Sequence, residues 1–217
     1  MLVIRALSVL SQFFFPSNTV MLLSGKHVAY IEQLETSTGP FEYLLSEHLR
    51  IHGLYWGLTA LQLLDASPNT DAVLARCLAC RNTDGGFGGS AGHDSHLLAT
   101  LSAVQILASL DALHLVDGST AAYIASLRQP DGGWAGDHWG EVDTRFVYCA
   151  VSALSLLKAL HLVSPAATAG YLARCQNYGT LKLTRRRLWQ CSRRRVTCRP
   201  DLLLRRLARH PQRTASH

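Results

Sequence analysis

The stretch from residue 96 to residue 110 is almost entirely apolar or small, which is typical of a helix buried on most of its sides. Residues 117–119 break this pattern, and Ser119 or Thr120 is expected to cap a second helix that ends near Arg128. The apolar positions of this second helix fall on one side, at Ala121, Ile124, Ala125 and Leu127. The pattern therefore predicts an inner helix followed by an outer helix, with no competing strand pattern.

A glycine-rich turn follows the outer helix and recurs along the chain. Residues 82–89 align with residues 129–136 at an offset of 47 positions, around an Asp-Gly-Gly-Phe and an Asp-Gly-Gly-Trp sequence. The glycines can adopt positive φ in the turn. We expect the aromatic residue after each turn, Phe87 or Trp134, to pack back against its helix pair.

The repeat extends in both directions from this central unit. Upstream, residues 59–64 align with residues 102–107 as a partial copy. Downstream, residues 143–160 predict a third inner helix, and residues 164–175 predict an outer helix that starts with a Ser-Pro cap. Such units bury one another's inner faces, and an array needs about three or more of them for stability. The sequence therefore predicts an all-α fold of about two and a half repeats.

The charge of the chain is divided unevenly. The formal net charge is +6, but residues 1–178 are mildly acidic, whereas residues 179–217 carry eleven Arg and Lys182 against a single acid, Asp201. The repeat pattern also stops here, because no fourth glycine turn follows Tyr178. The sequence predicts three parts, which are an N-terminal extension (residues 1–20), helical repeats (residues 21–178) and a divergent Arg-rich tail (residues 179–217).

Three interpretations of the Arg-rich tail are open. A splice or frameshift product is favoured, because the pattern is lost abruptly inside a turn motif. A genuine tail could neutralise the phosphates of a nucleic acid or an acidic membrane. The third interpretation is a helical arm that binds an acidic partner. Nucleic acid is unlikely as a partner, because the tail has only one aromatic residue, Trp189, and no recognised RNA motif.

The first residues of the chain form an apolar run that contains one arginine and ends at Pro16. This run is too short and too polar to span a membrane. No convincing small-residue cleavage site follows it. A targeting segment and a plain extension of the domain both remain open.

The six cysteines show no disulfide framework. Four of them lie inside apolar helical patterns, where a free cysteine behaves as a small hydrophobic residue. Cys77 and Cys80 form an isolated Cys-x-x-Cys on a predicted outer helix, which we interpret as part of the core. This cysteine usage indicates a reducing compartment, and we expect a cytoplasmic protein.

Longer sequence runs are more specific than the glycine turn. The two most specific are Leu-Ser-Ala-Val-Gln-Ile-Leu at residues 101–107 and Trp-Gly-Glu-Val-Asp-Thr-Arg-Phe at residues 139–146; further runs lie at residues 26–31, 46–50, 53–58 and 92–98. These runs resemble the β subunits of the protein prenyltransferases, and most closely the β subunit of Rab geranylgeranyltransferase. The resemblance extends from about Met21 to Tyr178.

The resemblance implies an α/α toroid with a deep apolar funnel, of which this chain would hold an incomplete part. It also implies an obligate α subunit as partner. The implied reaction transfers a geranylgeranyl group from geranylgeranyl diphosphate to C-terminal cysteines of Rab GTPases, which an escort protein presents. In this family a zinc ion holds the acceptor cysteine as a thiolate.

The resemblance assigns lipid-binding positions to the inner helices, at His52, Tyr55, Trp56, Leu98, Leu101 and Tyr148. The alternative is that all six are ordinary core residues. His52 departs from the family, because the enzymes resembled usually keep a small residue at this position. A histidine would shorten the lipid tunnel or place a polar ring in it, so the length of the lipid stays open.

Arg145 and Asp143 match a family pair at the mouth of the funnel, where an arginine can meet the lipid diphosphate or the peptide. The alternative is a pair at the beginning of a helix, where Asp143 would be favourable at the positive end of the helix dipole.

The zinc ligands implied by the family are not found in this sequence. The family takes an Asp-x-Cys pair and a distant histidine from later repeats, and no Asp-x-Cys occurs in this chain. His93 and His96 resemble a ligand pair, but we expect them to begin the inner helix, one as a cap and one packed. We therefore expect a chain that is weakly stable alone and that does not turn over substrate.

Two other functions stay open. A triterpene cyclase also uses an α/α barrel with Gln-x-x-Asp-Gly-x-Trp repeats. Residues 129–134 resemble this pattern, with one residue instead of two between Gln129 and Asp131, but the Asp-rich acid motif of the cyclases is missing. A non-catalytic protein could instead bind the α subunit or an isoprenoid.

Overall fold

The structure is a computed structural model that describes residues 22–36 and 39–175. The chain divides into two units, with the boundary between Ser119 and Thr120. The first unit contains α2 Ser24–Thr36, α3 Pro40–Leu45, η1 Glu47–Leu49, α4 Arg50–Leu63, α5 Thr70–Ala79, α6 Leu97–Ser109 and η2 Leu113–Leu115. Helix α7 Gly118–Ser126 begins at the boundary, and the second unit continues with α8 Thr144–Leu156, η3 Leu160–Leu162 and α9 Pro165–Cys175.

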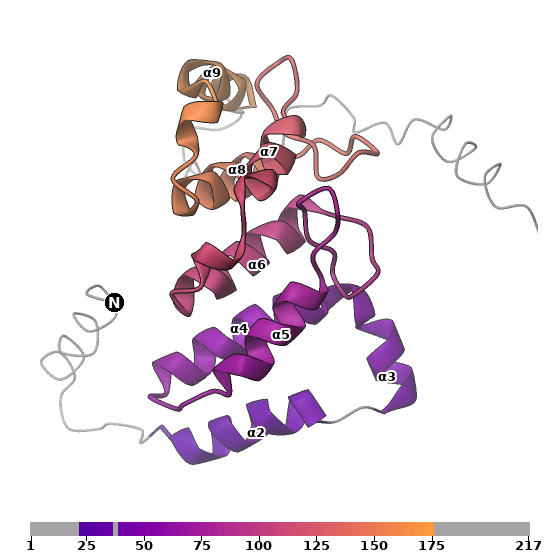
Figure 1. Cartoon of the computed structure of the whole chain (residues 1–217), viewed down its shortest axis with the longest axis vertical. Helices are drawn as coiled ribbons and strands as arrows, with labels where there is room; N and C mark the ends of the chain where they lie inside the picture. Colours follow the sequence, from indigo (N-terminus) through magenta and orange to yellow (C-terminus); the bar gives the residue numbers. More distant parts are fainter. Residues whose placement is uncertain (1–21, 37–38, 176–217) are drawn as a thin grey trace, which may run out of the picture. The chain divides into compact units, whose positions relative to one another are not determined.

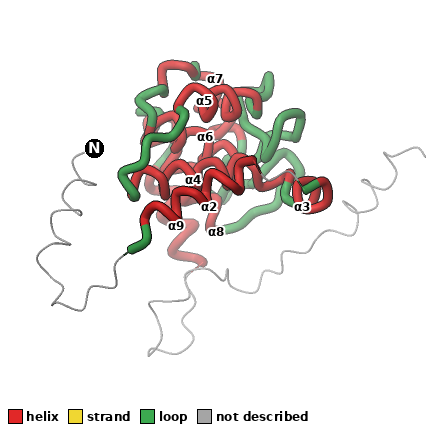
Figure 2. Tube along the Cα trace, turned by 90° about the horizontal axis from the view of Figure 1, so that it is seen from below, coloured by secondary structure: helices red, strands yellow, loops and turns green. Residues whose placement is uncertain are grey.

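The all-α prediction is confirmed for these residues. The part of the chain that the structure describes contains helices and turns but no strand, apart from three isolated bridges between single residues (Figure 2). None of the described helices is both long enough and apolar enough to cross a membrane. The predicted extension and the predicted Arg-rich tail lie outside the described residues, so their boundaries stay predictions.

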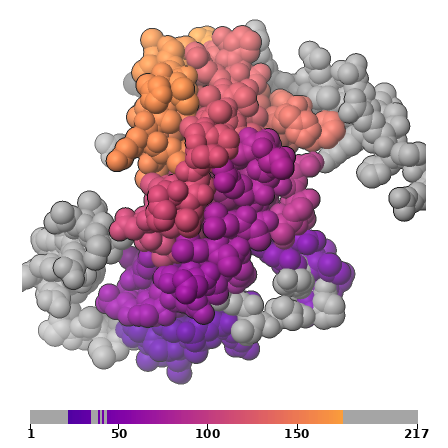
Figure 3. Space-filling view, in the orientation of Figure 1, coloured from indigo at the N-terminus to yellow at the C-terminus, as the bar shows by residue number. Residues whose placement is uncertain are grey.

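In the first unit, α4, α5 and α6 lie side by side (Figure 1). Their shared core consists of residues from these three helices together with Cys80 after α5, the aromatic residue of the glycine turn and Ala112; the buried members are Ile51, Leu54, Leu58, Val73, Cys77, Cys80, Phe87, Ala99, Ala103, Ile106, Leu107 and Ala112. The space-filling view shows a continuous surface, purple to magenta, over this part of the chain (Figure 3). The predicted location of Cys77 and Cys80 in the core is thereby confirmed.

Helix α6 is the most deeply buried helix of the first unit. Nine of its thirteen residues are buried, which confirms the expectation from the apolar run at residues 96–110. It follows that this helix depends on packing around most of its circumference rather than on one amphipathic face.

The two glycine turns have the same local structure. The carboxylate of Asp84 accepts a hydrogen bond from the amide of Gly86 at 2.8 Å, and that of Asp131 accepts one from Gly133 at 2.9 Å. The intervening glycines have positive φ, at +87° and +89°. Phe87 and Trp134 are both fully buried, as the sequence predicts.

The inner helices α4, α6 and α8 end in the same way. A residue with positive φ follows each of them, namely Asp65, Asp111 and Lys158. The next amide then donates to the carbonyl five residues earlier, at 2.9 Å for Ala66, 2.7 Å for Ala112 and 2.8 Å for Ala159. Closing bonds of this type satisfy carbonyl groups that the last helical turn leaves unpaired.

These helix ends correct the alignment of the first repeat. Asp65 and Asp111 lie 46 positions apart, and Asp111 and Lys158 lie 47 apart. Residue 59 therefore corresponds to residue 105, not to residue 102 as the sequence alignment proposed. The error amounts to three residues, which is close to one helical turn and leaves the apolar face of a helix almost unchanged.

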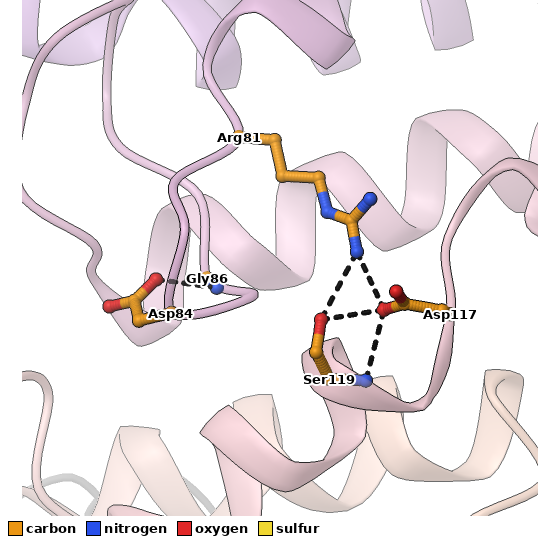
Figure 4. Close-up of polar contacts among 5 residues, drawn as sticks. All are labelled: Arg81, Asp84, Gly86, Asp117 and Ser119. Carbon is orange, nitrogen blue, oxygen red and sulfur yellow. Dashed lines mark hydrogen bonds and ion pairs between the residues drawn. The ribbon is translucent and has the colours of Figure 1, made fainter.

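The beginning of α7 and the end of α8 also differ from the predictions. Asp117, not Ser119 or Thr120, caps α7, because its carboxylate accepts from the amide of Ser119 at 3.0 Å (Figure 4). Helix α8 ends at Leu156, four residues early, because Lys158 takes positive φ and a separate 3₁₀ turn follows. The predicted Ser-Pro start of α9 is confirmed, since the Ser164 hydroxyl accepts from the amide of Ala167 at 3.4 Å.

Candidate functional site

Three predicted lipid-binding residues lie on α4. His52 is half-buried, and its Nδ1 lies 2.8 Å from the hydroxyl oxygen of Ser102 on α6. Tyr55 is partly buried against the core of the first unit. Trp56 is 63% exposed, and its ring centroid lies 6.2 Å from that of His52. The first turns of α4 thus present one polar and two aromatic side chains on or near the surface.

The two predicted residues of α6 differ in burial. Leu98 is half-buried, whereas Leu101 is buried and keeps only 6% of its surface exposed. Leu101 therefore matches the alternative reading as a core residue. Trp56 and Tyr148 contradict that reading, because they are 63% and 61% exposed.

The corrected alignment places six of the predicted residues at two positions of the repeat. His52, Leu98 and Arg145 each lie thirteen positions before the positive-φ residue that follows their inner helix. Tyr55, Leu101 and Tyr148 each lie ten positions before it. Positions three apart share one face of a helix. These six residues, which were predicted from the family resemblance, therefore lie on the corresponding face of each inner helix, α4, α6 and α8.

Asp143 and Arg145 form the beginning of α8. The Asp143 carboxylate accepts a hydrogen bond from the amide of Arg145 at 2.7 Å, so Asp143 is the N-cap. Its Oδ1 also lies 3.0 Å from Nε of Arg145. This hydrogen bond raises the pKa of Arg145, so the guanidinium remains charged. The reading as a pair at the start of a helix is correct, and a role for Arg145 toward a diphosphate or a peptide stays a prediction.

Residues 22–180 match the family model of the prenyltransferase alpha-alpha toroid domain. The chain belongs to this family. The predicted fold class, part of an α/α toroid, is therefore confirmed.

Relatives in this family carry a more specific name. The chain is 52% identical over 101 residues to the geranylgeranyl transferase type-2 subunit beta of Saccharomyces cerevisiae, which covers 45% of this chain and 31% of the yeast protein. It is 48% identical over 97 residues to the probable geranylgeranyl transferase type-2 subunit beta of Dictyostelium discoideum, covering 44% and 29%. The matched part of the chain thus spans about a third of the length of these relatives.

A solved prenyltransferase shares the fold at lower sequence identity. The Candida albicans protein geranylgeranyltransferase-I complexed with GGPP superposes with a TM-score of 0.55 and 20% identity, over 59% of this chain and 41% of that one. At this identity the likeness supports the toroid fold alone.

The zinc that the prenyltransferase family implies does not fit the described residues. Within residues 22–36 and 39–175, no three His, Cys, Asp or Glu side chains come together as a metal site. Burial raises the pKa of the Cys77 thiol to about 12 and that of Cys149 to about 11. Both cysteines are therefore neutral thiols near pH 7, whereas zinc binds the thiolate.

Ser102 is a site residue that the sequence did not reveal. It is 6% exposed within the apolar run of α6 and lies at hydrogen-bond distance from His52. The one available signal was a hydroxyl residue in a stretch predicted to be buried, since a buried hydroxyl needs a partner.

Replacing the N-cap of α8 should separate its structural role from its charge. We expect Asp143→Ala to lower the free energy of unfolding by about 1 kcal/mol, because the amide of Arg145 loses its acceptor. Asp143→Asn keeps an acceptor and should cost about half of that or less. Urea titrations of both variants measure the difference. Equal losses would mean that the carboxylate does not act through the cap.

Proposed function

We propose that this chain acts as the β subunit of a Rab geranylgeranyltransferase. In this role it takes part in the transfer of the geranylgeranyl group from geranylgeranyl diphosphate to C-terminal cysteines of Rab GTPases. The support comes from membership of the prenyltransferase toroid family and from identities of 48% and 52% to type-2 β subunits over about a hundred residues. The identity to the type-2 β subunits is the observation that carries the proposal.

The described residues would contribute to holding the isoprenoid chain. The two repeated positions on the inner helices carry His52, Tyr55, Leu98, Leu101, Arg145 and Tyr148. Apolar and aromatic side chains at such positions favour a hydrocarbon ligand, by about 0.8 kcal/mol for each methylene group removed from water. Tyr148, and Trp56 directly after Tyr55 on α4, are 61% and 63% exposed, so both stand to gain from being covered by a lipid.

The proposed reaction forms a thioether. The cysteine thiolate of the Rab protein attacks C1 of the lipid, the new C–S bond forms as the C–O bond breaks, and diphosphate leaves with the bonding electrons. Arg145 stays charged beside Asp143 and is the candidate in this chain for meeting an anion, either the diphosphate or a peptide carboxylate. The acceptor Rab, its escort protein and the α subunit are the proposed partners, in the cytoplasm.

Co-expression with the α subunit tests the partnership and the reaction together. The proposal predicts that the whole chain copurifies with the α subunit of a type-2 geranylgeranyltransferase. The complex is then incubated with zinc, labelled geranylgeranyl diphosphate, a Rab protein and its escort. Failure to copurify, together with failure to bind the lipid diphosphate, would overturn the proposal.

The same preparation tests the expectation that the chain does not turn over substrate. That expectation rests on the missing Asp-x-Cys pair and predicts capture of the α subunit without label on the Rab cysteines. Transfer at a rate near that of a full-length homologue would contradict it. Capture without transfer would assign the chain a non-catalytic role within this enzyme family.

A further inference from the structure

The N-cap of α6 is a histidine that must be neutral to act. The amide of Leu98 donates to Nδ1 of His96 at 3.1 Å, and His96 has the extended backbone of an N-cap residue. A backbone amide can only donate, so Nδ1 must keep its lone pair. Protonation of the ring removes this acceptor and places a positive charge at the positive end of the helix dipole.

The other side-chain caps of the described helices have no such dependence. His96 lies 47 positions before Asp143, which caps α8 in the same way. Asn69 caps α5, Asp117 caps α7 and Ser164 caps α9. Asparagine and serine do not titrate near neutral pH, and aspartate titrates near pH 4. The deeply buried α6 thus has as its cap a histidine, the residue type whose ordinary charge change falls between about pH 5 and pH 8.

A second histidine joins α4 to the same helix. Nδ1 of His52 lies 2.8 Å from the Ser102 hydroxyl, in the half-buried contact between α4 and α6. Burial lowers the pKa of His52, and the positive charges that His96 and His48 can carry lower it further. Burial therefore favours the neutral form of His52, and a positive charge on His96 would favour it further.

The remaining charges near this contact are distributed over several elements. Helix α6 itself carries no ionisable side chain. Those on the elements packed against α4 and α6 are Lys26, His27, Tyr30 and Glu32 on α2; Glu47 and His48 on η1; Asp71, Arg76 and Cys77 on α5; Cys80, Arg81, Asp84, His93 and Asp94 in the segment that follows α5; His114 on η2; and Arg50 and Tyr55 on α4 itself. Oε1 of Glu47 lies 3.7 Å from a guanidinium nitrogen of Arg50, and Oε2 of Glu47 lies 3.9 Å from Nε2 of His93. The carboxylate of Glu47 is therefore shared between these two side chains.

We propose that His96 and His52 make the packing of α4 against α6 acid-sensitive, and with it the face of these helices that carries His52, Tyr55, Leu98 and Leu101. At neutral pH both rings are neutral, the cap is intact and the two helices stay joined. In mild acid the cap is lost, and a positive charge on His96 opposes protonation of His52, which is half-buried beside Ser102 of α6. The effect on ligand binding rests on the proposed function, whereas the effect on packing does not.

The direction of the pH dependence follows from the neutral folded form. A histidine with a lowered pKa in the folded state binds its proton more readily in the unfolded chain. Its contribution to stability is therefore complete above about pH 6.5 and is lost as the pH falls below that value. As the pH is lowered, the free energy of unfolding of the first unit should therefore begin to fall at a higher pH than that at which the carboxylates titrate.

The test compares the whole chain with variants whose caps do not titrate. Asparagine matches the position of Nδ1 and already caps α5, so His52→Asn and His96→Asn keep an acceptor at both places. The exposed His114 provides the control variant His114→Gln. Urea unfolding, followed by circular dichroism at about pH 7.5 and about pH 5.5, reports the ratio of folded to unfolded chain.

We expect acidification to lower this ratio at least about fivefold in the wild type and in His114→Gln, and about half as much or less in the double variant His52→Asn/His96→Asn. An equal loss in the double variant would overturn the proposal. If His96→Asn does not fold, His96→Asp copies the cap of α8 and serves in its place.

A ligand arm separates this inference from the proposed function. Fluorescent geranylgeranyl diphosphate should bind the wild type more weakly at about pH 5.5 than at about pH 7.5, and the double variant should lose less affinity. Absence of binding by the wild type at either pH would count against the proposed function. The unfolding data would still decide the acid-sensitive contact.

Discussion

We expect Phe87→Ala to lower the free energy of unfolding of the first unit by about 3–5 kcal/mol. Phe87 follows the first glycine turn, is fully buried and belongs to the core shared by α4, α5 and α6. The substitution removes the aromatic ring of Phe87 from the close-packed core and leaves a cavity that the three helices can only partly close. A urea titration followed by circular dichroism measures the loss.

Phe41 provides a matched control for this substitution. It lies on α3 and is 69% exposed, so Phe41→Ala should change the free energy of unfolding by about 0.5 kcal/mol or less. If the two variants lost equal stability, the aromatic residue of the glycine turn would not be the anchor of the helix pair.

Gly85→Ala should cost about 3 kcal/mol, for two separable reasons. Gly85 has a φ of +87°, which an alanine adopts only with strain. A Cβ at this position would also lie 2.5 Å from the backbone carbonyl of Ser119. That backbone cannot move freely, because Arg81 donates hydrogen bonds to the Asp117 carboxylate at 2.7 Å and to the Ser119 hydroxyl at 3.1 Å (Figure 4).

Gly92→Ala separates the two contributions. Gly92 also has positive φ, +78°, but a Cβ added there would meet no atom within 4 Å. This variant should show only the conformational cost, about 1–2 kcal/mol. The difference between the two variants then gives the steric cost of the close approach to Ser119. A Gly92→Ala loss as large as that of Gly85→Ala would contradict the steric argument.

The sequence predicted the repeat unit because its signals are local. A helix that is apolar all round has few alternatives, and an Asp-Gly-Gly turn needs glycine where φ is positive, so α6 and both turns were found correctly. The offset of the first repeat was wrong by three residues, since one helical turn returns the same apolar face. Only the position of Asp65 in the structure fixes that register.

The candidate site was predictable in its positions but not in its contacts. Asp143 and Arg145 could be paired from sequence, because an acid two residues before a helical arginine is a local arrangement. The contact between His52 and Ser102 joins residues fifty positions apart, and no periodicity specifies it. The prediction of a Ser119 cap was wrong for a local reason, because Asp117 offered a competing acceptor one residue before α7 begins.

Binding of fluorescent geranylgeranyl diphosphate to the whole chain tests the central claim most directly. We predict saturable binding that unlabelled geranylgeranyl diphosphate displaces, with farnesyl diphosphate compared in parallel because His52 leaves the length of the lipid open. The double variant Trp56→Ala/Tyr148→Ala should weaken binding about tenfold or more without loss of folding, because both side chains are largely exposed. Leu172→Ala on the outer helix α9 is the control, since this residue is also apolar and 40% exposed. Absence of saturable binding, or equal affinity in all three chains, would contradict the account.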